Sequence, residues 1–245
     1  MTGVYRLADC NIAVTSLYRN VHSLCKDYSA ESGNIDFCVE TCSSDIEYEK
    51  SRSARERELE GLNARSYSEG YLETLAVYRK IAEKLSNFNA FLIHGSCVSV
   101  DGEGYLFIAK SGTGKSTHTR LWREMLGEKA VMINDDKPLV RINGEEVRIY
   151  GTPWDGKHRL SSNSSVPLKG ICLFERSEDN FIVPVTSKEA YPMLLKQIYR
   201  PGDMTALNKT ITLTDKTAET VPLWRAGCNI KPEAAEITYK AMNGL

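Results

Sequence analysis

Short apolar runs dominate the second half of the chain, and residues typical of turns separate them. Runs of this length, rich in β-branched and aromatic residues, predict strands rather than helices. The predicted strands lie at 90–100, 105–109, 130–134, 139–141, 146–150, 169–174, 181–185 and 222–228.

Two of the intervening turns carry hairpin signals. Asp101-Gly-Glu-Gly104 joins the first two predicted strands, and Asn143-Gly144 joins the fourth to the fifth. Asparagine, aspartate and glycine readily adopt the left-handed backbone that a tight hairpin requires. We also expect the strands at 169–174 and 181–185 to pair with each other.

Other segments repeat their apolar residues at helical spacing. The segment 71–85 does so, and Ser66-Tyr-Ser-Glu69 in front of it has the form of a capping box. The same reasoning predicts a helix from Lys115 to about Met125 that ends at Gly127. Further helices are predicted at 188–197, 203–217 and 233–242. The sequence therefore indicates a mixed α/β fold that is rich in strands.

The first 65 residues are patterned differently. We predict a helix at 16–26 and a strand at 35–40, and we interpret the charged run Glu47–Glu60 as a solvated connector. Two domains are therefore predicted. A small N-terminal α/β module spans 1–65, and a larger domain spans 66–245.

Composition narrows the class of protein. The 245 residues are 42% hydrophobic and 26% charged, which is enough apolar material for a packed core. The formal net charge is −1, so we expect neither nucleic acid nor a membrane surface as a partner. The N-terminus has an acidic residue and no long apolar run, which argues against a signal peptide or a membrane span. We expect a cytoplasmic protein.

The cysteines do not form a recognisable framework. There are seven, an odd number scattered along the chain, which fits reduced thiols better than disulfides. Cys38 and Cys42 are the closest pair, but no histidine or second cysteine pair lies near them at zinc spacing. A zinc site is not predicted.

The segment Ala109-Lys-Ser-Gly-Thr-Gly-Lys-Ser-Thr117 carries the clearest chemistry. Its glycines allow consecutive backbone N–H groups to turn toward phosphate oxygens, and the N-terminus of the following helix adds a favourable dipole. The residues that we expect to contact a nucleotide are Ser111, Gly112, Thr113, Gly114, Lys115, Ser116 and Thr117.

Individual positions in this loop have distinct expected roles. Lys115 reaches the β- and γ-phosphates, and the Ser116 hydroxyl joins the coordination shell of Mg²⁺. Ala109 stands where the usual pattern has its first glycine, so the match is one residue short. The alternative is a glycine-rich turn that merely caps a helix. A predicted strand before the loop and a helix after it favour ATP, or another nucleoside triphosphate, with Mg²⁺.

Two adjacent carboxylates support this interpretation. Asp135 and Asp136 directly follow the predicted strand 130–134, so they emerge at a strand end beside the loop. One carboxylate can hold Mg²⁺, and the other can act as a general base toward an acceptor hydroxyl. The alternative for such a pair is a solvated loop or a helix cap.

These motifs together resemble the HPr kinase/phosphorylase family and, more distantly, the phosphoenolpyruvate carboxykinases. The resemblance rests on the loop 109–117, on Ile93-His-Gly95 before it and on Asn134-Asp-Asp136 after it, and it covers roughly residues 90–240. It implies a mixed, strand-rich nucleotide-binding domain of the P-loop type. It also implies possible self-association into a homo-oligomer.

The resemblance assigns roles residue by residue. It implies that Lys115 and Ser116 bind phosphate and metal, with Asp135 as the catalytic base and Asp136 as a metal ligand. His94 matches the active-site histidine of the family, and the alternative is a histidine satisfied inside the sheet. Arg200 resembles a basic residue that reaches the active site from the C-terminal half, and the alternative is a surface arginine.

The chain also departs from the family. In place of the glycine-rich signature of the HPr kinases it has Gly151-Thr-Pro-Trp-Asp-Gly-Lys-His158, so we do not expect HPr as the substrate. We interpret this segment as an acceptor loop in which Trp154 packs on the substrate and Lys157 or His158 contacts an anion. The alternative is an ordinary hairpin exit with a packed tryptophan.

We therefore predict a kinase that transfers the γ-phosphoryl group of ATP to a hydroxyl of a peptide, a serine-like amino acid or another small molecule. Asp135, Lys115, Arg200 and His94 are the expected catalytic residues. Two other functions remain open: a regulatory protein that binds a nucleotide without transferring phosphate, and an NTP hydrolase that uses no acceptor other than water.

Overall fold

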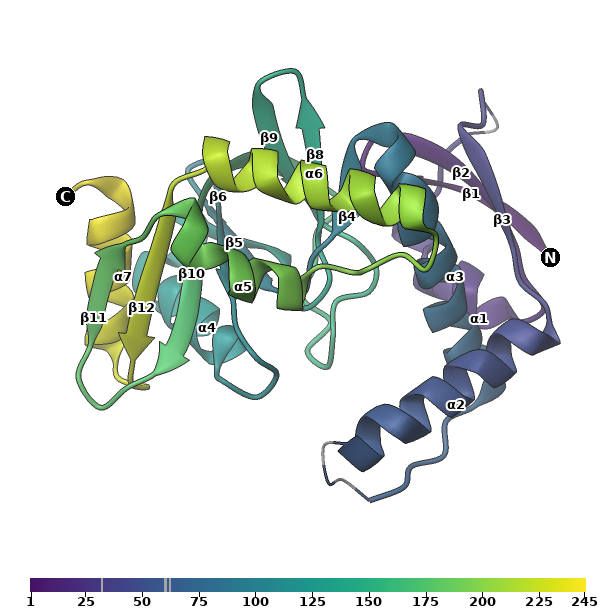
Figure 1. Cartoon of the computed structure of the whole chain (residues 1–245), viewed down its shortest axis with the longest axis horizontal. Helices are drawn as coiled ribbons and strands as arrows, with labels where there is room; N and C mark the ends of the chain where they lie inside the picture. Colours follow the sequence, from purple (N-terminus) through teal and green to yellow (C-terminus); the bar gives the residue numbers. More distant parts are fainter. Residues whose placement is uncertain (32, 60, 62) are drawn as a thin grey trace. The chain divides into compact units, whose positions relative to one another are not determined.

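In the computed structural model, which describes residues 1–31, 33–59, 61 and 63–245, the chain folds as two units, Met1–Leu85 and Ser86–Leu245 (Figure 1). This division differs from the predicted domain boundary after residue 65. The reason is helix α3, Glu69–Leu85, which packs on α1, Arg19–Leu24, and on α2, Ser43–Leu59, within the first unit.

A three-stranded sheet forms the centre of the first unit. Strands β1, Thr2–Leu7, and β2, Cys10–Thr15, form a hairpin, and β3, Phe37–Glu40, runs parallel to β2. The hairpin turn is Ala8-Asp9, with φ of 47° and 59°. The sequence does not predict this hairpin, because alanine is an unusual residue for a left-handed turn position. A short 3₁₀ helix, η1, Lys26–Tyr28, follows α1.

The charged run interpreted as a connector is instead helical. Helix α2 covers it up to Leu59, and Glu60 lies outside the described residues. Ion pairs rather than an apolar stripe hold α2 to α3. The Arg79 guanidinium lies 3.2 Å from the Asp45 carboxylate and 2.7 Å from that of Glu49. Charge alone therefore does not distinguish a solvated connector from a helix that docks through its carboxylates.

The start of α3 also differs in detail from its prediction. Ser68, rather than Ser66, accepts a hydrogen bond from the backbone N–H of Tyr71, at 3.3 Å. The helix begins at Glu69, so the cap lies two residues later than predicted, and Tyr71 at the third helical position cannot return the second bond of a capping box.

The second unit contains a nine-stranded sheet, and its strands match the predicted positions closely. They are β4 Ala90–Leu92, β5 Ser96–Val100, β6 Glu103–Ile108, β7 Ala130–Asn134, β8 Leu139–Asn143, β9 Glu146–Tyr150, β10 Ser165–Arg176, β11 Phe181–Pro184 and β12 Leu223–Cys228. The long predicted strand 90–100 is interrupted at Ile93-His94-Gly95, which leaves His94 between two strands that pair with different partners.

Strand β10 joins the two parts of this sheet. Its first residues pair antiparallel with β9, whereas its later residues run parallel to β6 on one side and to β12 on the other. Strand β11 pairs with β12. The prediction that 169–174 and 181–185 pair with each other is therefore wrong, because the distant strand β12 lies between them. Local sequence does not reveal such an insertion.

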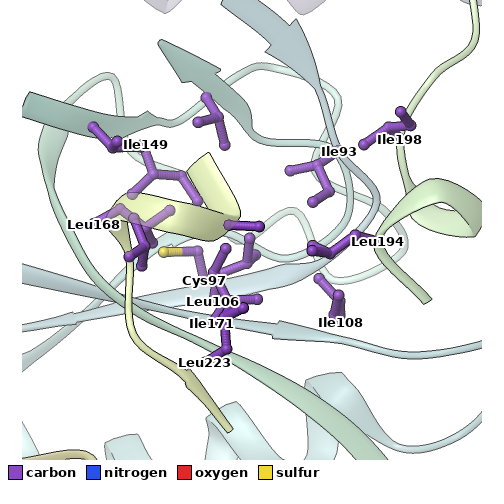
Figure 2. Packing of buried hydrophobic residues seen from close by; sticks show 14 of the residues in the cluster. Ile93, Cys97, Leu106, Ile108, Ile149, Leu168, Ile171, Leu194, Ile198 and Leu223 are labelled. Carbon is purple, nitrogen blue, oxygen red and sulfur yellow. The ribbon is translucent and has the colours of Figure 1, made fainter. Parts of the chain in front are cut away.

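Alternating residues of the strands divide the core between the two faces of the sheet. On β6, Leu106 and Ile108 belong to one apolar cluster, and Tyr105 and Phe107 belong to another. Figure 2 shows the first cluster, in which Leu106 gathers with side chains from β10, β12 and α5. The second cluster includes Trp122 from the opposite layer of helices.

Four helices cover these faces (Figure 1). Helices α5, Ser187–Gln197, and α6, Met204–Thr220, pack together and contribute to the first cluster. Helices α4, Lys115–Leu126, and α7, Pro232–Asn243, pack together and contribute to the second. The short 3₁₀ helices η2, Ser86–Phe88, and η3, Gly127–Lys129, complete the unit. The expectation of a mixed, strand-rich α/β fold is confirmed.

Two further observations concern the whole chain. None of the seven cysteines, all of which lie among the described residues, forms a disulfide. Within the described ranges, no helix combines the length and the apolar character needed to cross a membrane.

Candidate functional site

The candidate residues meet at one edge of the sheet. Strands β6, β10 and β12 run parallel, and β7 runs parallel to β6 because both are antiparallel to β5. The carboxyl ends of these four strands therefore share an edge, which is where ligands bind in open α/β sheets. The glycine-containing loop 109–114 leaves β6 there, and Asp135-Asp136 leave β7 there.

The loop between β6 and α4 has the backbone of an anion cradle. Gly112 has φ of 76°, and Gly114 has φ of 116° and forms the N-cap of α4. Among the described residues, no side chain caps this helix end. The first N–H groups of the helix thus remain available to a bound anion, such as a nucleotide phosphate. Ser111 and Gly112 are exposed, and Thr113, Gly114 and Thr117 are half-buried.

An arginine that the sequence analysis did not select holds this loop to the sheet. The guanidinium of Arg176, at the end of β10, donates to the carbonyl of Thr113 at 3.0 Å and to that of Gly112 at 2.6 Å. Nothing in the local sequence marks Arg176, because the parallel pairing of β10 with β6 brings the two segments together.

Lys115 lies at the start of α4 and is only 7% exposed. Its ammonium group donates to the carbonyl of Ala109 at 3.0 Å. Burial lowers the pKa of Lys115, whereas the carboxylates of Asp136 and Asp135 act in the opposite direction. The two carboxylates thus favour the charged form of a lysine whose charge burial alone would disfavour. Ala109, which replaces the usual first glycine, contributes this carbonyl and is itself buried.

Asp135 is buried and held by a chain of hydroxyl groups. Ser96 on β5 donates to the Asp135 carboxylate at 2.6 Å. Because its single proton is used there, the Ser96 hydroxyl accepts from Thr119 on α4, at 2.9 Å. Strand β5, strand β7 and helix α4 thus together fix the orientation of this carboxylate.

Asp136 is more exposed and lies among cationic and imidazole groups. One carboxylate oxygen is 3.4 Å from Nε2 of His94, and the other is 3.4 Å from the ammonium group of Lys137. The side-chain oxygen of Asn134 accepts from the backbone N–H groups of Asp136 and Lys137, at 2.8 and 2.7 Å. Asn134 therefore shapes the turn that presents Asp136.

The structure brings His94 to the acids. Its pKa is lowered, first by burial and then by the charges of Lys115 and Lys137, against the opposing effects of Asp136 and a hydrogen bond to the side chain of Gln197. His94 is therefore a neutral imidazole near pH 7. Its backbone N–H donates to the carbonyl of Gln197 at 2.7 Å, so the end of α5 fixes its position.

Arg200 does not lie with the other predicted catalytic residues, Asp135, Lys115 and His94. It is exposed and lies two residues beyond Ile198, which pairs with Ile93 in an antiparallel bridge. The antiparallel direction leads Arg200 away from His94 and toward the start of β4, and Gln197 occupies the neighbouring position instead. Among the described residues, Arg200 makes no hydrogen bond or ion pair with the acids, with Lys115 or with the loop.

The segment predicted as an acceptor loop does lie against the acids. The side-chain amide of Asn134 donates to the carbonyl of Thr152 at 2.9 Å, and a Cβ added at Gly156 would be 3.1 Å from Cβ of Asp136. Within this loop Lys157 and His158 are exposed. Trp154 is only 5% exposed, so the structure favours the alternative of a packed tryptophan over one that stacks on a substrate.

Asp155 is a third carboxylate in this region, and the sequence analysis did not select it. Burial raises its pKa, against a hydrogen bond from the Ser161 hydroxyl at 2.9 Å. The charge of Asp136 also raises it, so the two carboxylates lie close enough to interact. Asp155 lies between Pro153 and Gly156. These turn-forming residues were the one feature of the sequence that marked this segment as an ordered loop.

The donors needed for Mg²⁺ are present. Ser116 is half-buried, and its hydroxyl has no hydrogen-bond partner in the described part of the chain. No group of three or more His, Cys, Asp or Glu side chains is arranged around a metal position among the described residues. Mg²⁺ commonly uses one or two protein ligands together with phosphate oxygens and water, so Ser116 and Asp136 fit that ion.

Comparisons with known proteins leave the family open. No protein-family model and no curated protein matches the sequence. Among solved structures, the Hpr(Ser) kinase/phosphatase from Coxiella burnetii is similar to this chain, with a TM-score of 0.35 and 9% sequence identity. That match covers 62% of this chain and 95% of the other. The functional proposal therefore depends on the geometry of the site.

Proposed function

We propose that the chain is a kinase that transfers the γ-phosphoryl group of ATP, or another nucleoside triphosphate, to a hydroxyl of a peptide, an amino acid or another small molecule. One observation carries the proposal. A buried lysine at an uncapped helix N-terminus lies near two carboxylates on a neighbouring strand end, and one of these is fixed by the Thr119–Ser96 chain.

The loop and Lys115 bind the triphosphate in this proposal. The N–H groups at the start of α4 contact phosphate oxygens, and the Lys115 ammonium leaves the Ala109 carbonyl to meet the γ-phosphate. Ser116 and Asp136 are the proposed ligands of Mg²⁺. The metal would neutralise charge on the β- and γ-phosphates.

Asp135 is the proposed general base. Its carboxylate accepts the proton of the acceptor hydroxyl as the acceptor oxygen bonds to the γ-phosphorus, and the bond from that phosphorus to the bridging β-oxygen breaks to release the nucleoside diphosphate. The Ser96 bond leaves the second carboxylate oxygen of Asp135 available for this proton. Neutral His94 lies beside Asp136, where it orients that carboxylate without adding positive charge.

Asp135→Asn tests the assignment of the base. We expect phosphoryl transfer to fall by about 10²–10⁴-fold, while ATP binding changes little because the amide preserves the shape of the side chain. Asp179→Asn, at an exposed aspartate, is the matched control and should retain wild-type activity. Transfer at a near wild-type rate in Asp135→Asn would show that another group takes the proton.

A labelled-phosphate experiment separates the kinase from its alternatives. The protein is incubated with γ-labelled ATP, Mg²⁺ and fractionated cell extract or candidate hydroxyl compounds. A kinase moves label onto an acceptor in a Lys115-dependent manner. Label released only as phosphate would identify a hydrolase, and binding without turnover would identify a regulatory protein. Lys129→Ala, at an exposed lysine, is the control for Lys115→Ala.

A further inference from the structure

A pocket of about 440 Å³ lies directly beside the phosphate loop. This volume is within the usual range for small-molecule sites. Its lining comes from the loop, from α4, and from the ends of β10 and β12. The residues are Thr113, Gly114, Thr117, His118, Phe174, Arg176, Ser177, Glu178, Cys228, Asn229 and Ile230.

The pocket and the acids lie on different sides of the first turn of α4. Lys115 and Thr119 are four residues apart, share one face of the helix, and connect to Asp135. Thr117 and His118 point to other faces and line the pocket. The strand order of the sheet shows the same separation. Strand β7, which carries the acids, lies on one side of β6, and β10 and β12, which line the pocket, lie on the other side.

Two neighbouring rings form part of the wall of the pocket. The rings of His118 and Phe174 lie with their centroids 4.7 Å apart and at 39° to each other. Burial lowers the pKa of His118 to about 3, so this imidazole is neutral near pH 7. Ile230 adds an aliphatic side chain that is 79% exposed, although it lines a pocket. Because His118 and Phe174 are only 1% and 4% exposed, they form the floor of the pocket, and Ile230 supplies the apolar area that a planar heterocycle can cover.

The rim is polar and held in place by the fold. The side-chain amide of Asn229 donates to the carbonyl of Glu178 at 2.9 Å, and its backbone N–H donates to Asn180 at 2.9 Å. Arg176 is at the end nearest the phosphate loop, where its bonds to Gly112 and Thr113 place a positive charge. The rim thus combines the Asn229 amide with the charged side chains of Arg176 and Glu178.

We propose that this pocket holds the base and ribose of the donor nucleotide, so that the triphosphate runs from it across Gly114 and Lys115 to Asp135 and Asp136. The inference rests on the proposed nucleotide function. It also gives the bound donor a direction: its γ-phosphate faces the loop 151–158, and the acceptor enters from that side, away from the base.

Two substitutions in the pocket test this arrangement. Ile230→Ser removes the aliphatic wall at an exposed position, and Ser177→Phe fills the pocket from the residue that follows β10. Ile237→Ser, at an isoleucine on α7 that does not line the pocket, is the matched control. Binding of ATP and of inorganic tripolyphosphate is measured by calorimetry, and circular dichroism checks that each variant is folded.

We expect both pocket variants to weaken ATP binding about tenfold, because apolar contact with the base is lost or blocked. Tripolyphosphate has no base, so its affinity should stay within about twofold of the wild type. Unchanged ATP affinity in both variants, with Lys115→Ala still abolishing binding, would overturn the base pocket but leave the proposed function intact. A raised KM for the acceptor alone would instead assign the pocket to the acceptor.

A different result would exclude the proposed function itself. If the wild-type protein binds neither ATP nor tripolyphosphate, or if Lys115→Ala leaves both affinities unchanged, then the loop is not a nucleotide site. The base pocket is then excluded as well.

Discussion

His118 is a titratable side chain that is only 1% exposed, with its Nε2 2.9 Å from the hydroxyl of Thr238. Burial lowers its pKa from 6.5 to about 3. Between these values the unfolded chain binds a proton that the folded chain does not. We therefore expect the free energy of unfolding to fall as the pH falls from 6.5 to 3, by on the order of 5 kcal/mol, and this group to contribute no pH dependence above 6.5.

Urea unfolding at a series of pH values measures this effect. The variant His118→Gln keeps an amide nitrogen near the Nε2 position but cannot be protonated in this range. Its stability should therefore depend less steeply on pH than that of the wild type. Equal slopes for the two proteins would show that other groups dominate the acid sensitivity.

At the scale of the elements, Ser96 connects three of them. It lies on β5, donates to Asp135 after β7 and accepts from Thr119 on α4. Ser96→Ala should leave Asp135 free to rotate, so we expect phosphoryl transfer to fall about tenfold, while ATP affinity changes by less than about twofold. Single-turnover transfer and equilibrium binding separate these two quantities.

Strand β5 offers a matched control in Ser99, which is also buried but lies three residues further along, on the opposite face of the strand. Ser99→Ala should retain the wild-type rate. A parallel loss of rate in both variants would point to a general loosening of β5 instead of the orientation of Asp135.

At the scale of the whole molecule, a nucleotide should stabilise only one unit. All three tryptophans, Trp122, Trp154 and Trp224, belong to Ser86–Leu245, so their fluorescence reports on that unit alone. ATP with Mg²⁺ at about 100 times its Kd should add about 2.7 kcal/mol to the stability of this unit, and a metal chelator should reduce the gain.

Hydrogen exchange supplies the comparison for the other unit. Amides of α3, in Met1–Leu85, should exchange at the same rate with and without nucleotide, whereas those of α4 should slow down. Equal protection of both helices would show that the units respond to the nucleotide together.

The fold could be predicted wherever local residues decide the backbone. Gly127 and Asn143-Gly144 mark a helix end and a hairpin by their own conformational preferences, and the structure confirms both. The partner of a strand is not local. Strand β12 follows β11 by about 40 residues in the chain, yet it lies between β10 and β11 in the sheet. No turn residue in the sequence predicts this placement.

The candidate site divides in the same way. The sequence by itself determined the glycine-containing loop before α4 and the acid pair at the end of β7, because glycines followed by a helix start are properties of a continuous segment. Tertiary structure decided which side chains support them. Arg176, Ser96 and Gln197 come from three separate elements, while Arg200 is absent from the group and Trp154 is packed inside its loop. The physical reason is that the sheet order and the direction of each strand, which arise from burial over the whole unit, select the residues that meet at one edge.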